Sequence, residues 1–155
     1  MRNIRRPQSE ETLFKRFTEA AHPASKKPIF ATQRDFLCFL AVLGYNSGER
    51  TPITGKTTEL DSRVFEGHEQ SRDILYLIAL AGAKDANILQ PENEDQMVKI
   101  FEEYVASGFK VLDRWLKECP DDHIGDQAII TSIRKEGFFG SHVTSIEKAI
   151  GDVVF

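Results

Sequence analysis

The stretch of sequence that decides the fold is residues 93–119, NEDQMVKIFEEYVASGFKVLDRWLKEC. Its apolar residues recur at spacings of three and four, which is the period of one face of an α-helix. These residues are Met97, Ile100, Phe101, Tyr104, Gly108, Val111, Leu112 and Trp115. Asn93 is a suitable N-cap, and Pro120 ends the pattern. A helix of this length spans about 37 Å, so we expect the other helices to pack against it.

Shorter apolar segments on both sides of this stretch predict further helices. We expect them over residues 9–22, 32–43, 70–81 and 125–136, with a last short helix that begins at Thr144. Gly44, Gly82 and Gly137 follow three of these segments, where a glycine can end a helix. The acidic pair at positions 102 and 103 flanks the apolar face of the long helix, so we interpret it as solvated.

The patterns together predict a mainly all-α fold, a bundle of about five to six helices around the long one. Residues 45–67 are rich in turn formers, and either a small β-hairpin or an irregular connection fits them. We expect residues 1–8 to form a flexible basic arm and residues 9–155 a single helical domain. No apolar run reaches the roughly 18 residues of a membrane span, which predicts a cytoplasmic protein.

The net charge of −4 is unevenly distributed along the chain. Residues 1–58 carry ten Lys and Arg against five Asp and Glu, and residues 59–155 carry ten against nineteen, so balances of +5 and −9 give the total. The acidic majority argues against non-specific DNA binding by the whole surface. A local basic face near the N-terminus remains open, and it suits DNA phosphates or an acidic protein partner.

Motifs for known chemistry are incomplete in this sequence. The segment 54–57, TGKT, ends like a phosphate-binding loop, but Arg50 stands where that loop needs its first glycine. The histidines lack zinc-ligand spacing, and Cys38 and Cys119 lie in apolar contexts typical of buried thiols. We therefore predict no enzyme, no metal and no cofactor. A small hydrolase with a site assembled from distant residues is the remaining enzymatic alternative, with Ser47, Asp61, His68 and His123 as its candidates.

Two groups of polar residues are candidates for binding a protein or DNA. The first group follows a core helix and could offer hydrogen bonds from a fixed base: Tyr45, Asn46, Ser47 and Arg50. The second group is basic: Arg5, Arg6, Lys26, Lys27 and Arg34. In the alternative interpretation, Arg50 merely pairs with a nearby acid, and the N-terminal basic residues are simply solvated.

Two segments resemble a known family. Residues 29–53, IFATQRDFLCFLAVLGYNSGERTPI, are similar to a helix, glycine and basic-loop segment of small accessory proteins encoded beside bacterial DNA phosphorothioation (dnd) genes. Residues 73–116 resemble the rest of that pattern, above all in the turn at Lys84 and Asp85 and in the run at 101–104, FEEY. The resemblance covers about residues 29–118. It implies a setting in DNA sulfur modification and its linked restriction, and it brings no catalytic residues.

These observations lead to competing hypotheses. The first is a non-enzymatic accessory or regulatory subunit of a bacterial DNA-modification and phage-defence system, which binds a larger protein of that system. The second is a direct DNA-binding protein that uses the basic residues named above together with Arg2. The absence of a recognisable reading helix counts against the second hypothesis. A homodimer is compatible with both hypotheses, because three helices carry a surplus of apolar residues.

Overall fold

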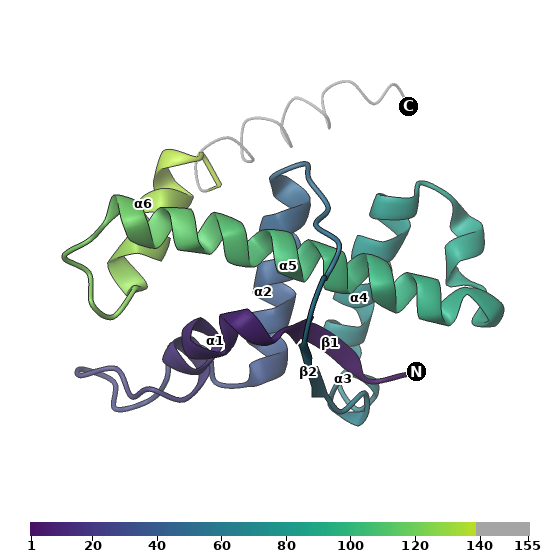
Figure 1. Cartoon of the computed structure of the whole chain (residues 1–155), viewed down its shortest axis with the longest axis horizontal. Helices are drawn as coiled ribbons and strands as arrows, with labels where there is room; N and C mark the ends of the chain where they lie inside the picture. Colours follow the sequence, from purple (N-terminus) through teal and green to yellow (C-terminus); the bar gives the residue numbers. More distant parts are fainter. Residues whose placement is uncertain (139–155) are drawn as a thin grey trace, which may run out of the picture. The chain divides into compact units, whose positions relative to one another are not determined.

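The computed structural model describes residues 1–138 and is mainly helical, which confirms the predicted fold class (Figure 1). The α-helices of this part are α1 (Glu11–Thr18), α2 (Gln33–Asn46), α3 (Arg63–Glu66), α4 (Glu69–Ala83), α5 (Glu94–Glu118) and α6 (Asp126–Lys135). Its short 3-10 helices are η1 (Gln8–Glu10), η2 (Ala86–Leu89) and η3 (Pro91–Asn93), and its strands are β1 (Ile4–Pro7) and β2 (Thr57–Leu60). The helix expected at Thr144 lies outside the described residues.

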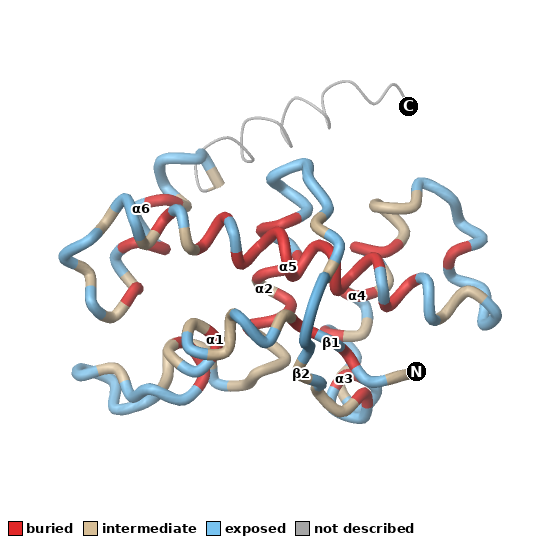
Figure 2. The backbone as a smooth tube through the Cα atoms, viewed as in Figure 1, coloured by how far each residue is buried: buried red, intermediate tan, exposed pale blue. Residues whose placement is uncertain are grey.

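The chain divides into two compact units, residues 1–113 and residues 114–155, and the boundary falls within α5. The single domain expected over residues 9–155 stays a prediction. The predicted bounds of α5 agree with the observed ones to within one residue at each end. The part of the predicted apolar face of α5 that belongs to the first unit is buried (Figure 2). Phe101 and Leu112 are fully shielded from solvent.

An aromatic cluster forms the core of the first unit where α1, α2 and α5 meet. The Phe36 ring of α2 lies 5.5 Å from Phe14 and 5.4 Å from Phe17 of α1, measured between centroids. The same ring lies 6.0 Å from Phe109 of α5, at nearly a right angle. All four side chains are buried, so this cluster joins the three helices through the hydrophobic effect and aromatic packing.

The prediction that Gly44 and Gly82 end their helices is wrong. Gly44 does not end α2, which continues to Asn46, and Gly82 does not end α4, which continues to Ala83. Both glycines instead allow close approach to α5, because a Cβ on Gly44 would lie 2.0 Å from the Tyr104 carbonyl oxygen and one on Gly82 would lie 2.7 Å from the Tyr104 ring. A residue in the left-handed conformation, Lys84, caps α4.

The N-terminal segment is a β-strand where we expected a flexible arm. β1 pairs antiparallel with β2, with Arg5 opposite Glu59. Ile4 is fully buried and Arg6 is 4% exposed, so alternate residues of β1 enter the core. Residues 45–67 therefore contain the strand β2. It pairs with the distant N-terminal strand β1 and does not form the local hairpin that was one of the two expected arrangements.

In the second unit, the turn before α6 is organised by one carboxylate. Asp122 accepts hydrogen bonds from the amides of Gly125 and Ala128, both at 2.8 Å. These bonds satisfy donors at the start of α6 that have no partner inside the helix. Trp115 is buried in the same unit, and its indole N–H donates to Glu136 Oε1 at 2.9 Å.

Candidate functional site

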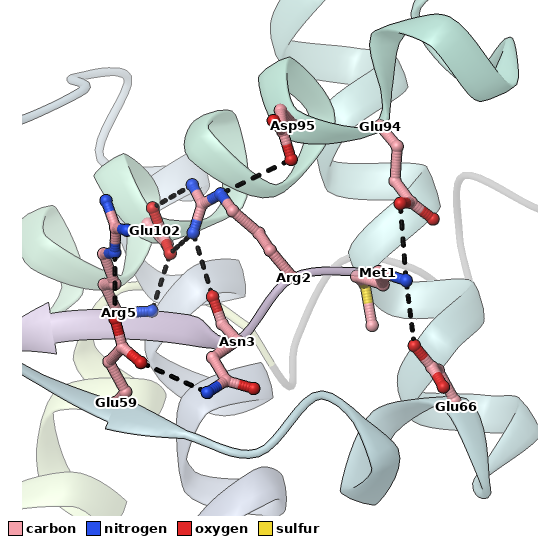
Figure 3. Close-up of polar contacts among 9 residues, drawn as sticks. All are labelled: Met1, Arg2, Asn3, Arg5, Glu59, Glu66, Glu94, Asp95 and Glu102. Atoms are coloured by element: carbon pink, nitrogen blue, oxygen red, sulfur yellow. Dashed lines mark hydrogen bonds and ion pairs between the residues drawn. The ribbon is translucent and has the colours of Figure 1, made fainter.

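The charged residues around β1 and the middle of α5 form the most elaborate polar network of the first unit (Figure 3). At its centre is Glu102 of α5, which is 4% exposed. Arg2 donates to both carboxylate oxygens of Glu102, at 2.5 and 2.8 Å, and the backbone N–H of Arg5 donates at 2.6 Å. The expectation that Glu102 is solvated is therefore wrong. Its burial is tolerated because a bidentate guanidinium and a backbone amide replace water.

The outer edge of the network ties β1 to β2 and to neighbouring helices. Glu59 of β2 accepts hydrogen bonds from Asn3 Nδ2 at 3.1 Å and from Arg5 Nε at 3.3 Å, and the Asn3 bond, followed by the Arg5 bond, lowers the Glu59 pKa. The ammonium group of Met1 lies 3.0 Å from Glu66 and 3.3 Å from Glu94. These contacts, led by the Glu66 bond, raise the pKa of that amino group. Arg5, a predicted binding residue, is therefore already paired with Glu59.

Two other predicted basic residues are also engaged inside the unit. The guanidinium of Arg6 lies 3.8 Å from the Phe14 ring centroid, and its Nη1 donates to Glu11 at 2.5 Å. The hydrogen bond from Arg6 lowers the Glu11 pKa. Arg34 Nη1 donates to the Val64 carbonyl at 3.3 Å. Of the predicted basic group, Lys26 and Lys27 are exposed in the loop between α1 and α2, and Arg5 is exposed on β1.

The end of α2 and the start of the loop after it form one exposed segment, residues 45–50. Tyr45 is 42% exposed, and residues 46–50 are exposed as well. The Tyr45 ring meets the Tyr104 ring of α5 edge to face, with 5.4 Å between centroids. The Ser47 hydroxyl donates to the Gly44 carbonyl at 2.7 Å and closes the end of α2. The predicted binding residues of this loop therefore lie together at the surface beside a core helix.

Contacts with α5 fix the far end of this loop. Ser107 Oγ donates to the Glu49 carbonyl at 2.8 Å and lies 3.0 Å from the Thr51 hydroxyl. The Thr51 N–H donates to the Glu103 carbonyl at 3.2 Å. Arg50 Nε lies 3.0 Å from the Glu103 carboxylate, which is 6% exposed as a residue. Arg50 thus pairs with an acid, as the alternative interpretation held, while its neighbours remain exposed on a fixed backbone.

A cleft of about 510 Å³ lies between the N-terminal segment, residues 52–57 and α5. Its charged lining residues are Arg2, Arg5, Lys99, Glu102 and Glu103. Glu102 offsets Arg2, and Glu103 lies 4.0 Å from Lys99. A uniformly anionic ligand such as DNA would meet these carboxylates, so the cleft suits a polypeptide that presents both charge signs. No sequence pattern could identify Glu102 and Glu103 as buried, because their cationic partners lie about 50 to 100 residues away.

Two candidates of the possible composite hydrolase site, His68 and Asp61, have other contacts. His68 caps α4 by accepting from the Ser71 N–H at 3.4 Å, and Asp61 pairs with Arg63. Burial raises the pKa of Cys38 to about 11, which disfavours the nucleophilic thiolate at neutral pH. Residues 1–138 contain no group of three or more His, Cys, Asp and Glu side chains that could hold a metal ion.

Comparison with known proteins gives the family setting. The family model of the DNA sulphur modification system-associated protein 4 matches residues 3–141. The chain belongs to this family. The match confirms the resemblance seen in residues 29–118 and extends it to β1 and α6, so the strand that carries the polar network lies within the family's span. Searches among curated proteins and among solved structures give no match. Within residues 1–138, no helix combines the length and apolarity that a membrane crossing requires.

Proposed function

We propose that this chain is a non-enzymatic accessory or regulatory subunit of a bacterial DNA sulphur modification system and its linked restriction in phage defence. It acts by binding a larger protein of that system in the cytoplasm. The family assignment supports the setting. The observation that carries the protein-binding role is the exposed segment at residues 45–50, which begins as the last residues of α2 and is held at its other end by α5.

The physical argument rests on preorganisation. A mobile loop loses conformational entropy when a partner orders it, whereas a loop that is already anchored loses less and binds more tightly for the same contacts. Tyr45 presents an exposed aromatic ring held against Tyr104, and aromatic residues are frequent energetic anchors of interfaces. Asn46 adds an exposed amide that can donate and accept.

Co-purification tests this proposal. The tagged chain, expressed with the other proteins of its DNA sulphur modification gene cluster, should recover at least one of them in a stoichiometric complex. Replacing Tyr45 and Asn46 together by alanine should reduce recovery at least about tenfold, the loss of one or two interface anchors. The matched control is Gln127→Ala, an exposed position on α6. Failure to recover any protein of the cluster would overturn the proposal.

Direct DNA binding is the second candidate, and the exposed pair Lys26 and Lys27 is the observation that favours it. Arg5, Arg6 and Arg34 contribute less than a sequence count suggests, because each already lies close to a carboxylate. Binding through the lysines would be weak and would fall steeply with salt. Gel shifts at low salt with modified, unmodified and nicked duplexes test whether the chain binds DNA. A variant with both Lys26→Gln and Lys27→Gln should lose any shift that the loop between α1 and α2 produces.

A further inference from the structure

A groove lies between α2 and α4 on the first unit. It has a volume of about 320 Å³ and is lined by Cys38, Phe39 and Val42 of α2 and by Ile74 of α4. The two helices run in the same direction, because Cys38 lies against the Ser71 carbonyl near their starts and glycines near their ends both meet Tyr104. With 14 and 15 residues, they present a surface of roughly 20 Å along their axes.

The apolar lining continues along both helices beyond the groove. Val42 is 44% exposed and Leu77 is 63% exposed. On α2, residues 35, 39, 42 and 46 share one helical face, and on α4 residues 70, 74, 77 and 81 do the same, because their spacings are three and four. Exposed apolar residues gathered on two adjacent helices mark an interaction surface.

Two carboxylates lie beside the groove, and one of them is paired with an arginine of the same helix. Asp35 lines it on the α2 side, where its carboxylate lies 3.4 Å from Arg34 Nη2 and stays 43% exposed. Asp73 flanks the apolar stripe of α4, one turn before Leu77. No lysine or arginine lines the groove in the described part of the chain. Arg72 projects from the side of α4 opposite to the stripe, since it is two residues from both Gln70 and Ile74.

We propose that this groove binds an amphipathic helix of a partner protein whose apolar stripe is flanked by lysine or arginine. Such a helix would place side chains at i, i+3 or i+4 and i+7 against Val42, Ile74 and Leu77. Its flanking cations would face Asp35 and Asp73. A second copy of this chain is disfavoured as the occupant, because its own groove lining has no lysine or arginine to offer these carboxylates. The inference rests on the proposed function in that it requires a protein partner.

Designed peptides provide the direct test. The probe is a helix of about 18 residues with leucines at the stated spacing and lysines on both flanks, and its control carries glutamates instead. The lysine peptide should bind at least about tenfold more tightly than the glutamate peptide by fluorescence anisotropy. Asp35→Asn with Asp73→Asn should remove most of that preference. Equal binding of the two peptides would overturn the proposal.

Groove variants locate the binding surface. Val42→Gln with Leu77→Gln should weaken binding of the lysine peptide at least about tenfold. Leu89→Gln changes an equally apolar residue, 45% exposed on η2, and should leave binding unchanged. Val42 and Leu77 are both exposed, so circular dichroism of the groove variant should show unchanged folding. If the lysine peptide bound the groove variant as tightly as the unmodified chain, the proposal would be overturned. A homodimer that sedimentation detects and that the groove variant dissociates would overturn it as well.

The natural partner segment is sought with overlapping peptides that cover the proteins of the DNA sulphur modification gene cluster. A bound peptide should carry the basic amphipathic pattern and lose binding to the groove variant. If the tagged chain recovers proteins of the cluster equally well with and without the groove substitutions, the proposed function stands and the groove assignment fails. If it recovers none while the lysine peptide still binds in the groove, the proposed function fails and the groove chemistry stands.

Discussion

Gly44 of α2 and Gly108 of α5 lie where the two helices touch backbone to backbone. A Cβ on Gly44 would lie 2.9 Å from the Gly108 amide nitrogen, and a Cβ on Gly108 would lie 2.0 Å from the Leu40 carbonyl oxygen. Neither position has room for a side chain, and the obstacles are backbone atoms that cannot rotate away. This contact sets the distance between the two helices and thereby the position of the exposed loop that follows α2.

Gly44→Ala and Gly108→Ala should each destabilise the first unit by about 3 kcal/mol, because the helices must separate to admit the methyl group. Urea unfolding followed by circular dichroism measures the change. Gly67→Ala is the matched control: its Cβ would meet one carbonyl oxygen at 3.2 Å and its backbone is in an ordinary conformation. Equal stability of the Gly44 and control variants would contradict the close approach.

The helices could be predicted from sequence because their apolar residues repeat within each segment. The period over residues 93–119 predicts both ends of α5 to within one residue. The helix expected from residue 32 begins where Thr32 caps α2 by accepting from the Asp35 N–H. Such signals are local, so one segment suffices to recognise them. The close approach at Gly44 and Gly108 cannot be recognised from one segment alone. Their role depends on which helix lies opposite, and a glycine near a helix end looks like an ordinary stop signal.

The polar network could not be predicted for a related reason. β1 is four residues long, and it is stabilised by pairing with residues 50 to 56 positions away. Burial of Glu102 depends on Arg2, a hundred residues earlier in the chain. A single sequence therefore shows an acid beside an apolar stripe and a basic N-terminus, and it contains no signal that joins them. The exposed loop after α2 was found because turn residues follow a strongly apolar helix.

The buried Glu102 carboxylate makes a second prediction possible. Glu102→Ala leaves the Arg2 guanidinium and the Arg5 N–H without their acceptor, which should lower the free energy of unfolding by about 2 kcal/mol. The value is below that of a fully buried pair because the Arg2 side chain is 25% exposed. Asp95→Ala removes the other, 84% exposed, carboxylate near Arg2 and should change stability by less than about 0.5 kcal/mol. Equal effects of the two variants would argue against a structural role for Glu102.

The pKa of Asp61 provides a pH-dependent test of the segment between β2 and α3. Hydrogen bonds from the Arg63 side chain and then from its backbone lower this pKa from 3.8 to about 2. The stabilisation is therefore complete above pH 3.8 and is lost as the pH falls toward about 2, since protonation removes the acceptor charge. A carboxyl-detected NMR titration should place the Asp61 midpoint near 2, and Arg63→Gln should return it toward 3.8. An unshifted midpoint in the unmodified chain would contradict this pairing.

The anchors of the loop at residues 45–50 can be tested without a partner. Ser107→Ala removes the donor to the Glu49 carbonyl and the neighbour of the Thr51 hydroxyl. We expect faster hydrogen exchange of the amides between Asn46 and Arg50, with a loss of global stability of about 1 kcal/mol. Ser25→Ala, in the exposed loop before α2, is the control that should leave these amides unaffected. If exchange of the 46–50 amides were unchanged in Ser107→Ala, the rigidity on which the proposed interface depends would have another source.

The second unit offers a test of its own, because it contains the single tryptophan of the chain. Asp122 accepts from the amides at the start of α6, so Asp122→Ala should destabilise this unit by about 1 to 2 kcal/mol, the usual cost of losing a helix cap. Trp115 is 1% exposed and its indole N–H is bonded to Glu136, so its fluorescence reports local unfolding as a red shift of the emission. The shift should occur at lower urea concentration in Asp122→Ala than in Asp121→Ala, whose side chain is exposed in the same turn. Coincident transitions for the two variants would mean that the Asp122 bonds add nothing to the stability of α6.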